Sequence, residues 1–385
     1  MENFTYHNPT KIVFGKNQIS ELKNLINSQY KILFLYGGGS IKSNGIYDQV
    51  IKILSDYKVV EFPGIEPNPE YDTCMQAIKV IKENDLDFIL AVGGGSVIDA
   101  AKFIAAGVLY ANDPWEIIDQ RISITNALPI GTVLTIPATG SEMNGGSVIS
   151  RSSLNKKRGF MSDAVFPKFS VLDPTVTYSL PSRQVANGVV DAFVHVMEQY
   201  LTFNQNAPLQ DRFAESILMT LLEEGEKVLN NPKDYDVRAN IMWCATMALN
   251  TLIGRGVKHD WSTHMIGHEL TVVYGLDHAQ TLAIILPSIM KYKMNEKADK
   301  IIQYAERVLK VDSSLPDNKK ILYAIERTKT FFQKMGNKTC LSDYNVDINK
   351  ISDVIQQLEK NGMIALGENE NITIADSKKI IKMSI

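Results

Sequence analysis

One pattern in the sequence constrains the fold more than any other: a short apolar run that ends in Gly-Gly-Gly-Ser and leads into a helical segment. It occurs at 31–40 (KILFLYGGGS) and again at 87–96 (DFILAVGGGS). Such runs are typical of parallel β-strands whose crossover helices cover a sheet. Similar patterns surround them, with strand-like runs at 58–62 and 131–138 and helical segments at 49–54, 73–85 and 97–111. Residues 1–180 are therefore expected to form an α/β domain with a parallel, Rossmann-like sheet.

The pattern changes after about Leu180. Strand-like runs nearly vanish, and segments such as 211–231 and 237–253 place apolar residues at helical spacing. The chain has 385 residues, which at roughly 100–200 residues per domain suggests two domains. We expect an all-helical domain at 181–385, joined to the first domain near Pro181.

The composition argues against several classes of protein. The net charge is −3, so no basic surface for nucleic acid is indicated. No apolar stretch reaches the ~18 residues of a membrane-spanning helix, and residues 1–15 lack the segments of a signal peptide. The three cysteines form no CxxC pair, which disfavours a disulfide framework. We expect a cytoplasmic protein, because unpaired cysteines suit a reducing compartment.

The second glycine loop, at 93–96, has the chemistry of a phosphate-binding site. Glycines let the backbone adopt positive φ and approach a ligand closely, and the N–H groups at the start of the next helix attract phosphate. Ser96 and Asp99 have the S-x-x-D spacing of a capping box. The loop is not the G-x-G-x-x-G fingerprint, so an ordinary glycine turn without phosphate stays an alternative.

The first glycine loop bears on the choice of nicotinamide cofactor. Many NAD enzymes place an acidic residue near the end of a neighbouring strand, where it binds the ribose hydroxyls. This chain instead has Gly39, Ser40 and then Lys42. Small residues, a hydroxyl and a cation favour a 2′-phosphate, and hence NADP(H). The alternative is that Lys42 is only a solvated surface charge.

Histidines gather in one part of the helical half. Three of the six lie close together, His264, His268 and His278. His264 and His268 are four residues apart, so they face one way on a helix. Gly275 is expected to end that helix and Asp277 to cap the next one, which places His278 in its first turn.

An earlier apolar segment, DAFVHVMEQY, carries a carboxylate and an imidazole on one face, because Asp191 and His195 are four residues apart. With the later histidines they form a ligand set for a divalent transition metal, such as Zn, Fe, Ni, Cu or Mn. Beside a nicotinamide, such an ion would act as a Lewis acid on a carbonyl oxygen. Three alternatives stay open: core histidines without metal, a plain Asp191–His195 pair, and Glu198 as a rival ligand.

Longer motifs show a family resemblance that covers nearly the whole chain. They include YGGGSIK, GIEPNPEYDT, AVGGGSVIDAAKFIA, TIPATGSEMN, NGVVDAFVHVMEQY, HMIGHEL and GLDHAQTLAI. On these motifs the chain resembles the iron-containing alcohol dehydrogenases, in particular the NADPH-dependent butanol dehydrogenases and broad-range aldehyde reductases. The resemblance implies an α/β dinucleotide-binding domain followed by an all-helical domain, the two-domain plan that dehydroquinate synthases share.

The resemblance also implies roles for the clustered residues. The four metal ligands of the family are matched by Asp191, His195, His264 and His278. Glu198 is left with a structural role. His268 becomes a non-ligand and the candidate catalytic residue, through cofactor contact or proton relay.

The cofactor-binding positions of the family are spread over six segments of this chain. The matching residues are Gly38, Gly39, Ser40, Asn68, Gly94, Gly95, Ser96, Thr135, Thr139, Ser141, Asn144, Lys157 and His268. Lys156 and Arg158 make the match of Lys157 ambiguous. The residues of TIPATGSEMN could instead hold their own loop together.

The implied activity is that of an NADP(H)-dependent alcohol dehydrogenase that reduces aldehydes such as butanal, with one Fe²⁺, Zn²⁺ or Mn²⁺ ion and a homodimeric assembly. The alternatives are a glycerol dehydrogenase of the same plan and an inert NADPH or metal sensor. A dehydroquinate synthase would need basic phosphate-binding residues that the sequence does not place. Gly267 and Ala279 stand where many members have alanine and glycine, which leaves the pocket shape and the preferred substrate open.

Overall fold

The two apolar runs that end in glycines form neighbouring parallel strands in the computed structural model, which describes residues 1–385. They belong to a six-stranded sheet, β1 (Lys11–Phe14), β2 (Lys31–Tyr36), β3 (Lys58–Phe62), β4 (Phe88–Gly94), β5 (Ile130–Ile136) and β8 (Phe169–Leu172). The order across the sheet is β1-β8-β5-β4-β2-β3, and all neighbours are parallel. The predicted parallel sheet is confirmed.

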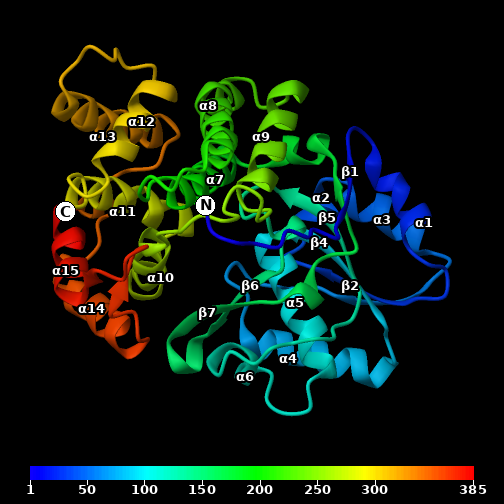
Figure 1. Cartoon of the computed structure of the whole chain (residues 1–385). Helices are drawn as coiled ribbons and strands as arrows, with labels where there is room; N and C mark the ends of the chain where they lie inside the picture. The colour runs from blue at the N-terminus through cyan, green and yellow to red at the C-terminus, as the bar shows by residue number, and fades with distance from the viewer. The chain divides into compact units, whose positions relative to one another are not determined.

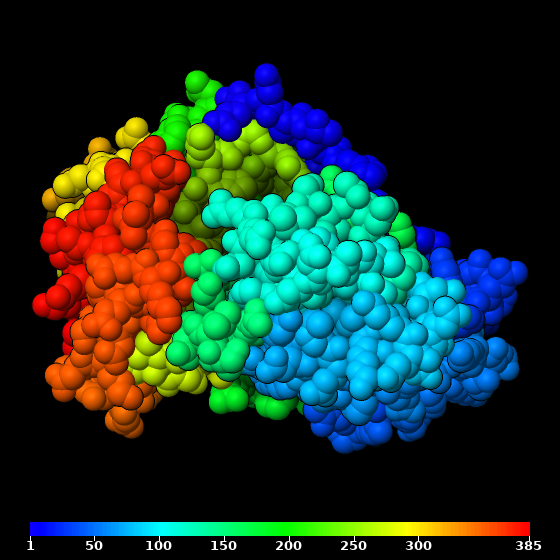
Figure 2. Space-filling model, turned by 90° about the horizontal axis from the view of Figure 1, so that it is seen from below, coloured from blue at the N-terminus to red at the C-terminus, as the bar shows by residue number.

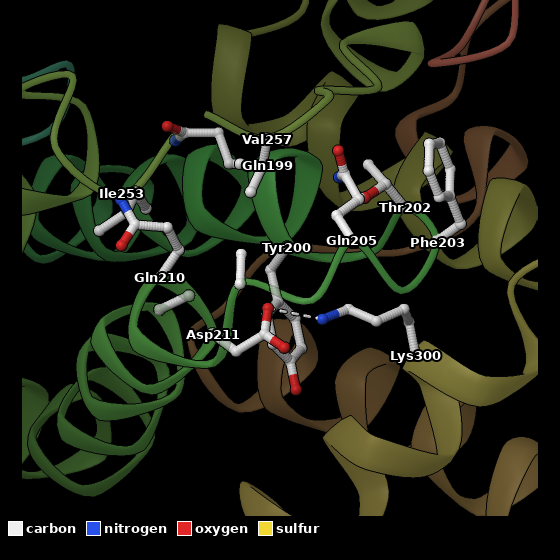
Figure 3. Close-up of a pocket in the computed structure, with 12 residues that line it drawn as sticks. Gln199, Tyr200, Thr202, Phe203, Gln205, Gln210, Asp211, Ile253, Val257 and Lys300 are labelled. Carbon is white, nitrogen blue, oxygen red and sulfur yellow. Dashed lines mark hydrogen bonds and ion pairs between the residues drawn. The ribbon is translucent and has the colours of Figure 1, made fainter. Parts of the chain in front are cut away.

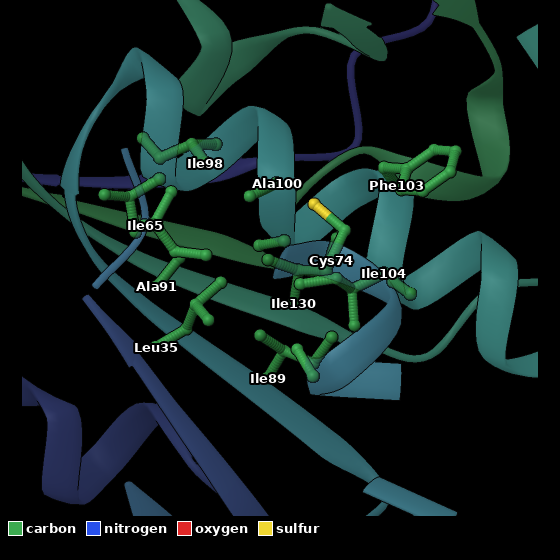
Figure 4. Close-up of a cluster of buried hydrophobic side chains, with 14 of the residues drawn as sticks. Leu35, Ile65, Cys74, Ile89, Ala91, Ile98, Ala100, Phe103, Ile104 and Ile130 are labelled. Atoms are coloured by element: carbon green, nitrogen blue, oxygen red, sulfur yellow. The ribbon is translucent and has the colours of Figure 1, made fainter. Parts of the chain in front are cut away.

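Helices cover both faces of this sheet, which explains why its central strands read as continuous apolar runs. One face carries α1 (Leu22–Leu25) and α3 (Ile46–Leu54), and the other carries α4 (Tyr71–Asn84), α5 (Gly95–Leu109) and α6 (Trp115–Asp119) (Figure 1). Alternate residues of β2 feed the two cores, Ile32 and Phe34 on the side of α3, Leu33 and Leu35 on the side of α5. Figure 4 shows this second core, where Leu35 and Ile89 lie among the buried side chains.

The direction of the strand order reverses between β2 and β4. From β2 the chain continues to β3 on one side, and it then returns to form β4 on the other side. In open α/β sheets, ligands bind at such a switch point, beyond the carboxyl ends of the strands. The loop at 37–40 follows β2, and glycines 93–95 join β4 to α5. The topology therefore brings both glycine loops to the place where a nucleotide is expected.

An antiparallel hairpin, β6 (Gly146–Arg151) and β7 (Lys156–Met161), lies between β5 and β8 in the sequence. It was not predicted, since the charged run KKRGFM lacks the alternation of a half-buried strand. Ser150 bridges to Glu70, just before α4, and β6 packs against α5. In Figure 2, α4 and the chain that follows it (light blue to cyan) spread over one face of this part of the molecule.

By its internal packing the chain divides into an α/β unit, residues 7–180 and 233–242, and a helical unit, residues 1–6, 181–232 and 243–385. The predicted domains differ from these units at 1–6 and 233–242. The reason at 233–242 is packing: the first half of α9 (Tyr235–Ala248) supplies Met242 to the core beneath α5.

The helical unit has eight further helices, α7 (Ser182–Tyr200), α8 (Pro208–Asn230), α10 (Ser262–Tyr274), α11 (His278–Tyr292), α12 (Ala298–Arg307), α13 (Asp317–Lys334), α14 (Ile351–Lys360) and α15 (Ile374–Met383). Helix α11 packs against α7 and α10, and its apolar residues share a core with α14 and α15. The unit is not purely helical as predicted, because a ribbon of β9 (Ala365–Leu366) and β10 (Ile372–Thr373) precedes α15. Two-residue strands are too short to leave a periodic signal.

The remaining elements are short. They are α2 (Ser40–Ser43) and the 3₁₀ turns η1 (Gln18–Glu21), η2 (Ser141–Met143), η3 (Ser152–Leu154), η4 (Asp163–Val165), η5 (Pro174–Ser179), η6 (Leu341–Tyr344) and η7 (Ile348–Lys350). None of the helices combines the length and the apolar character needed to cross a membrane.

Candidate metal centre and nucleotide loops

Three helices of the helical unit carry the four predicted metal ligands. Asp191 and His195 lie one turn apart on α7, His264 lies in the first turn of α10, and His278 is the first residue of α11. Because α11 packs against both α7 and α10, residues more than sixty positions apart in the sequence come close together. The ligand atoms of Asp191, His195 and His264 all lie within 4.8 Å of one another, and His278 adjoins this group through Asp191.

The chain ends α10 and begins α11 as the sequence predicts. Gly275 ends α10 in the left-handed region with φ 69°, a conformation that favours glycine. Asp277 caps α11 in a capping box with Gln280. Asn187 of α7 donates to Asp277 Oδ2 at 2.9 Å. The position of His278 is therefore fixed by the cap and by a direct bond to α7.

The Asp191 carboxylate is the centre of the cluster. Its Oδ1 lies 3.8 Å from His195 Nε2, 3.9 Å from His264 Nε2 and 3.5 Å from His278 Nε2. These separations are too long for hydrogen bonds. Ligand atoms bound tetrahedrally at about 2.1 Å from one ion lie about 3.4 Å apart, so the spacing fits a shared metal.

The electrostatics of the cluster also fit a cation. Asp191 Oδ1 is buried and accepts no hydrogen bond, although a buried carboxylate without a partner is costly. Burial lowers the pKa of His195 to about 4, so this imidazole is neutral and can offer a lone pair. A divalent ion would supply the charge that the protein itself does not place next to Asp191. The donor set of one carboxylate and three imidazoles suits Fe²⁺, Zn²⁺ or Mn²⁺.

Glu198 does not join the ligand atoms. One of its oxygens bonds His264 Nδ1, and the other accepts from the Thr263 N–H at 2.6 Å. A carboxylate on the far nitrogen of a metal-binding histidine orients the ring and fixes its tautomer. Glu198 therefore turns His264 Nε2 toward Asp191, and the structural role expected for it takes this specific form.

His268 lies one turn after His264 on α10. Its ring centre is 6.2 Å from that of His264 and 5.2 Å from that of His278, beside the cluster. The preceding residue, Gly267, faces α11, where a Cβ would meet Thr281 Oγ1 at 2.9 Å. The departure from alanine at position 267 thus lets α10 and α11 pack closely where the ligands meet.

Trp261, just before α10, belongs to the site, and the sequence reading did not single it out. Its ring centre lies 5.3 Å from that of His264 and 6.2 Å from that of His195. Its Nε1–H donates to His259 Nδ1 at 3.1 Å. A left-handed φ of 62° for a bulky residue is the kind of strain that clusters at functional sites. The sequence signal that could have identified Trp261 is its position just before the predicted helix that carries His264 and His268.

In the first glycine loop, Gly38 and Ser40 are exposed, and Gly39 adopts φ 99° at the start of α2. Lys42 lies 4.7 Å from the ring centre of Tyr47, whose hydroxyl donates to Glu61. The Lys42 side chain is therefore held over an aromatic ring near this loop.

In the second loop, the glycines are required by packing. Their φ angles are not positive, contrary to the expectation, and the spacing of Ser96 and Asp99 forms no capping box, since Gly94 is the N-cap. A Cβ on Gly95 would lie 2.4 Å from Thr139 Oγ1, and a Cβ on Gly94 would meet Ile136 at 3.0 Å. The tight contact brings the start of α5 against the TIPATGSEMN segment.

That segment is fastened from within by Lys102 of α5. The fully buried Lys102 Nζ donates to Ser141 Oγ at 2.8 Å and Asn144 Oδ1 at 3.0 Å. Asp99, one turn earlier, accepts from Ser141 Oγ and from the Val148 N–H. These bonds favour the alternative that Ser141 and Asn144 hold their loop together, and their contact with a cofactor stays a prediction. Thr135 is buried in β5.

The structure brings together two predicted cofactor residues that are far apart in sequence. Lys157 Nζ donates to Asn68 Oδ1 at 2.8 Å. The rivals of Lys157 bind elsewhere, since Lys156 and Arg158 both pair with Asp119 at 2.8 and 3.1 Å. Lys157 is thus separated from its two basic neighbours.

Comparison with protein families agrees with these features over almost the full length. Residues 9–174 match the model for iron-containing alcohol dehydrogenase, and residues 185–384 match the model for the C-terminal part of the Fe-containing alcohol dehydrogenase family.

The chain belongs to the iron-containing alcohol dehydrogenase family.

Its similarity to individual members of the iron-containing alcohol dehydrogenases is also high. The chain is 53% identical to the NADPH-dependent aldehyde reductase YqhD of Escherichia coli, over 99% of each chain. It is 38% identical to NADH-dependent butanol dehydrogenase A of Clostridium acetobutylicum over the full length of both. The crystal structure of E. coli YqhD superposes with a TM-score of 0.98 at 52% identity, covering 100% of this chain and 99% of that one. The family resemblance and the fold class predicted from the motifs are confirmed.

Proposed function

We propose that this protein is a metal- and NADP(H)-dependent alcohol dehydrogenase that works mainly as an aldehyde reductase. The observation that carries the proposal is the buried Asp191 oxygen surrounded by three imidazole nitrogens at 3.5–3.9 Å. The names of its relatives support the reaction class, since they include an aldehyde reductase and several butanol dehydrogenases.

In this reaction the metal supplies a Lewis acid for the carbonyl oxygen and the reduced nicotinamide supplies hydride. The protein has to hold and orient both. Asp191, His195, His264 and His278 provide the metal ligands, and Glu198 fixes the ring of His264. We infer that His268, whose ring centre lies 5.2 Å from that of His278, or a water molecule passes a proton to the product oxygen. We infer that the glycine loop after β2 holds the 2′-phosphate of the nucleotide and that the loop after β4 holds its pyrophosphate.

The choice of NADP(H) rests on the first glycine loop. Gly38 and Ser40 are exposed there, without an acidic side chain, and Lys42 is close by. The relatives differ in their cofactors, because the one at 53% identity is named NADPH-dependent and others at 38–40% are named NADH-dependent. We expect kcat/KM for NADPH to exceed that for NADH. An equal or reversed preference would contradict this part of the proposal.

The metal role is tested by His264→Ala. Loss of one ligand from a four-ligand site should remove most of the bound metal and nearly all NADPH-dependent reduction of butanal, without unfolding the chain. Metal content, circular dichroism and initial rates measure these three effects. His7→Ala is the matched control, because His7 is exposed and belongs to the α/β unit. Full reductase activity in a metal-free variant would rule out the metal role.

The same assays separate the alternatives. A glycerol dehydrogenase would prefer polyols in a substrate panel, and an inert sensor would bind NADPH without turnover. A homodimer in the cytoplasm is also part of the proposal, and the solution mass at working concentration tests the dimer.

A further inference from the structure

Lys297, the residue before α12, is a buried lysine whose side chain joins three distant segments. Its ammonium donates to the Leu201 carbonyl at 2.7 Å, to Glu368 Oε2 at 2.9 Å and to Asp260 Oδ2. The side chains of Lys297, Asp260 and Glu368 are all at most 5% exposed. This is a fully desolvated ion cluster, outside the ligand set.

Two of the three segments adjoin the helices that carry metal ligands. Leu201 is the C-cap residue of α7, the helix of Asp191 and His195. Asp260 lies two residues before α10, the helix of His264. The Lys297 ammonium therefore links the C-terminal end of α7 to the segment just before α10.

Asp260 passes this link on to the start of α10. Its Oδ1 accepts the Ser262 N–H at 2.9 Å, and its own N–H donates to the Glu198 carbonyl at 2.9 Å. Between Asp260 and Ser262 stands Trp261 with its left-handed φ of 62°. A strained residue keeps its conformation only when its surroundings determine it from several sides. Lys297 contributes to this by binding Asp260, the residue directly before Trp261.

The charges show what would happen without the ammonium. Burial alone lowers the pKa of Lys297, but Asp260 and Glu368 reverse this and hold the pKa above its ordinary value, so the side chain stays charged. Without it, two buried carboxylates would face each other with no cation between them. Breaking a buried pair on one side leaves an uncompensated charge, and the structure moves to solvate it. Asp260 also accepts the Ser262 N–H, so a displaced Asp260 would shift Trp261 and the start of α10 with it.

We propose that Lys297 is a positioning residue for the metal centre, a clamp that sets His264 relative to the α7 ligands although it touches no ligand. The proposal rests on the proposed function only in taking Asp191, His195, His264 and His278 as the ligand set.

The test uses Lys297→Met in the full chain, with Co²⁺ as the probe. The d–d absorption of bound Co²⁺ reports ligand geometry, and competition with a chelator gives its affinity. Outer-shell partners of metal ligands are worth 10–100-fold in affinity. We expect Lys297→Met to bind Co²⁺ about 10-fold more weakly or worse, with a changed spectrum, while NADPH binding to the α/β unit is unchanged.

Two neighbouring lysines provide matched controls. Lys293 is equally buried but pairs with Glu296 and Asn371. Lys300 pairs with Asp211 and lies 4.3 Å from the ring centre of Tyr200 at the end of α7, beside a small pocket that none of the four ligands lines (Figure 3). Neither bonds Asp260. Lys293→Met and Lys300→Met should lower thermal stability and leave the Co²⁺ spectrum as in the wild type.

The outcomes distinguish failure of the Lys297 proposal from failure of the proposed ligand set. If Lys297→Met loses stability like the controls but keeps wild-type Co²⁺ affinity and spectrum, the clamp is overturned. If His264→Ala itself keeps the wild-type spectrum, the ligand set fails, independently of Lys297. If Lys297→Met does not fold, Asp260→Asn replaces it. Its amide oxygen still accepts from Ser262 while the bond to Lys297 is lost, so an unchanged affinity there also overturns the proposal.

Discussion

At the scale of single residues, the second glycine loop depends on the absence of a side chain at Gly95. A Cβ on Gly95 would lie 2.4 Å from Thr139 Oγ1 and 2.7 Å from its methyl carbon, so no side chain fits without moving the start of α5. The glycine is required here by close packing between two segments.

Gly95→Ala should therefore weaken NADPH binding. Overpacking a buried site costs roughly 1–3 kcal/mol. Because the clash would displace the glycine loop from its binding conformation, the Kd for NADPH should rise about tenfold. Fluorescence titration of NADPH measures it. Thr139→Ala removes the two nearest atoms, so thermal stability lost in Gly95→Ala should be partly recovered in the double variant. No recovery would show that the clash is not the cause.

Lys102 is a second residue whose effect can be predicted. Burial lowers its pKa to about 8, and it sits in one network with Asp99 through Ser141. Lys102→Met removes a buried cation that stabilises the Asp99 carboxylate by its charge and through Ser141, so thermal stability should fall. Thermal unfolding should show a smaller total loss in the Lys102→Met/Asp99→Asn double variant than the sum of the singles. Additive losses would mean that the two residues act independently.

At the residue scale, the sequence reveals paired side chains only where they lie three or four positions apart on one helix. Asp191 and His195 could be singled out because a helix places residues four apart on one face, and their apolar neighbours made the pair conspicuous. Asp99 and Lys102 give a similar signal at a spacing of three within VIDAAKFIAA. Lys297 gives none, since its partners Leu201, Asp260 and Glu368 come from three segments that only the tertiary fold joins.

At the scale of elements, the chain holds two capping boxes that begin helices. Asp277 begins α11 at the proposed metal ligand His278, and Thr373 begins α15, whose first turn contains no proposed ligand. We therefore expect the cap of α11 to affect metal binding as well as stability, and the cap of α15 to affect stability alone.

Asp277→Ala and Thr373→Ala form a matched pair. Each loses a cap worth about 1 kcal/mol of stability. Only Asp277→Ala also frees the first turn of α11, so its metal affinity should fall severalfold while that of Thr373→Ala stays at the wild-type value. Chelator competition gives the affinities and thermal unfolding the stabilities. Equal metal affinities in the two variants would contradict the positioning of His278 by its cap.

Strands were predictable where a strand-like run of five or more residues marked them. The predicted strands at 31–36 and 58–62 coincide with β2 and β3. The four-residue strands β1 and β8 were missed, because each is stabilised by pairing with a distant segment, Lys11 beside Phe169, rather than by its own pattern. The β6–β7 hairpin was missed because its second strand is charged and partly exposed.

At the scale of the whole molecule, the two units should respond to different ligands. A ligand that binds the native state at about 1,000 times its Kd stabilises it by about 4 kcal/mol. Removing the metal should therefore speed hydrogen exchange in α7, α10 and α11, while NADPH should slow exchange at the ends of β2 and β4. Mass spectrometry of peptides from each unit measures both. Metal removal that loosens the sheet and leaves the three helices unchanged would contradict the location of the site.

The strand order also belongs to this scale, and the sequence could not give it. The two glycine loops are similar in sequence, but only the reversal between β2 and β4 places them at one switch point. The family motifs predicted the correct fold without knowledge of the strand order, because the resemblance covers nearly the whole chain and implies the complete two-domain fold.

We have proposed that Asp191, His195, His264 and His278 hold one metal ion that the reductase reaction requires. The most direct measurement is reconstitution of chelated protein with increasing Fe²⁺, Zn²⁺ or Mn²⁺, following bound metal and NADPH-dependent reduction of butanal together. We predict negligible activity without metal and, in the wild type, a rise in activity that saturates at one bound ion per chain, with no rise in His264→Ala. Undiminished activity in the metal-free wild type would contradict it.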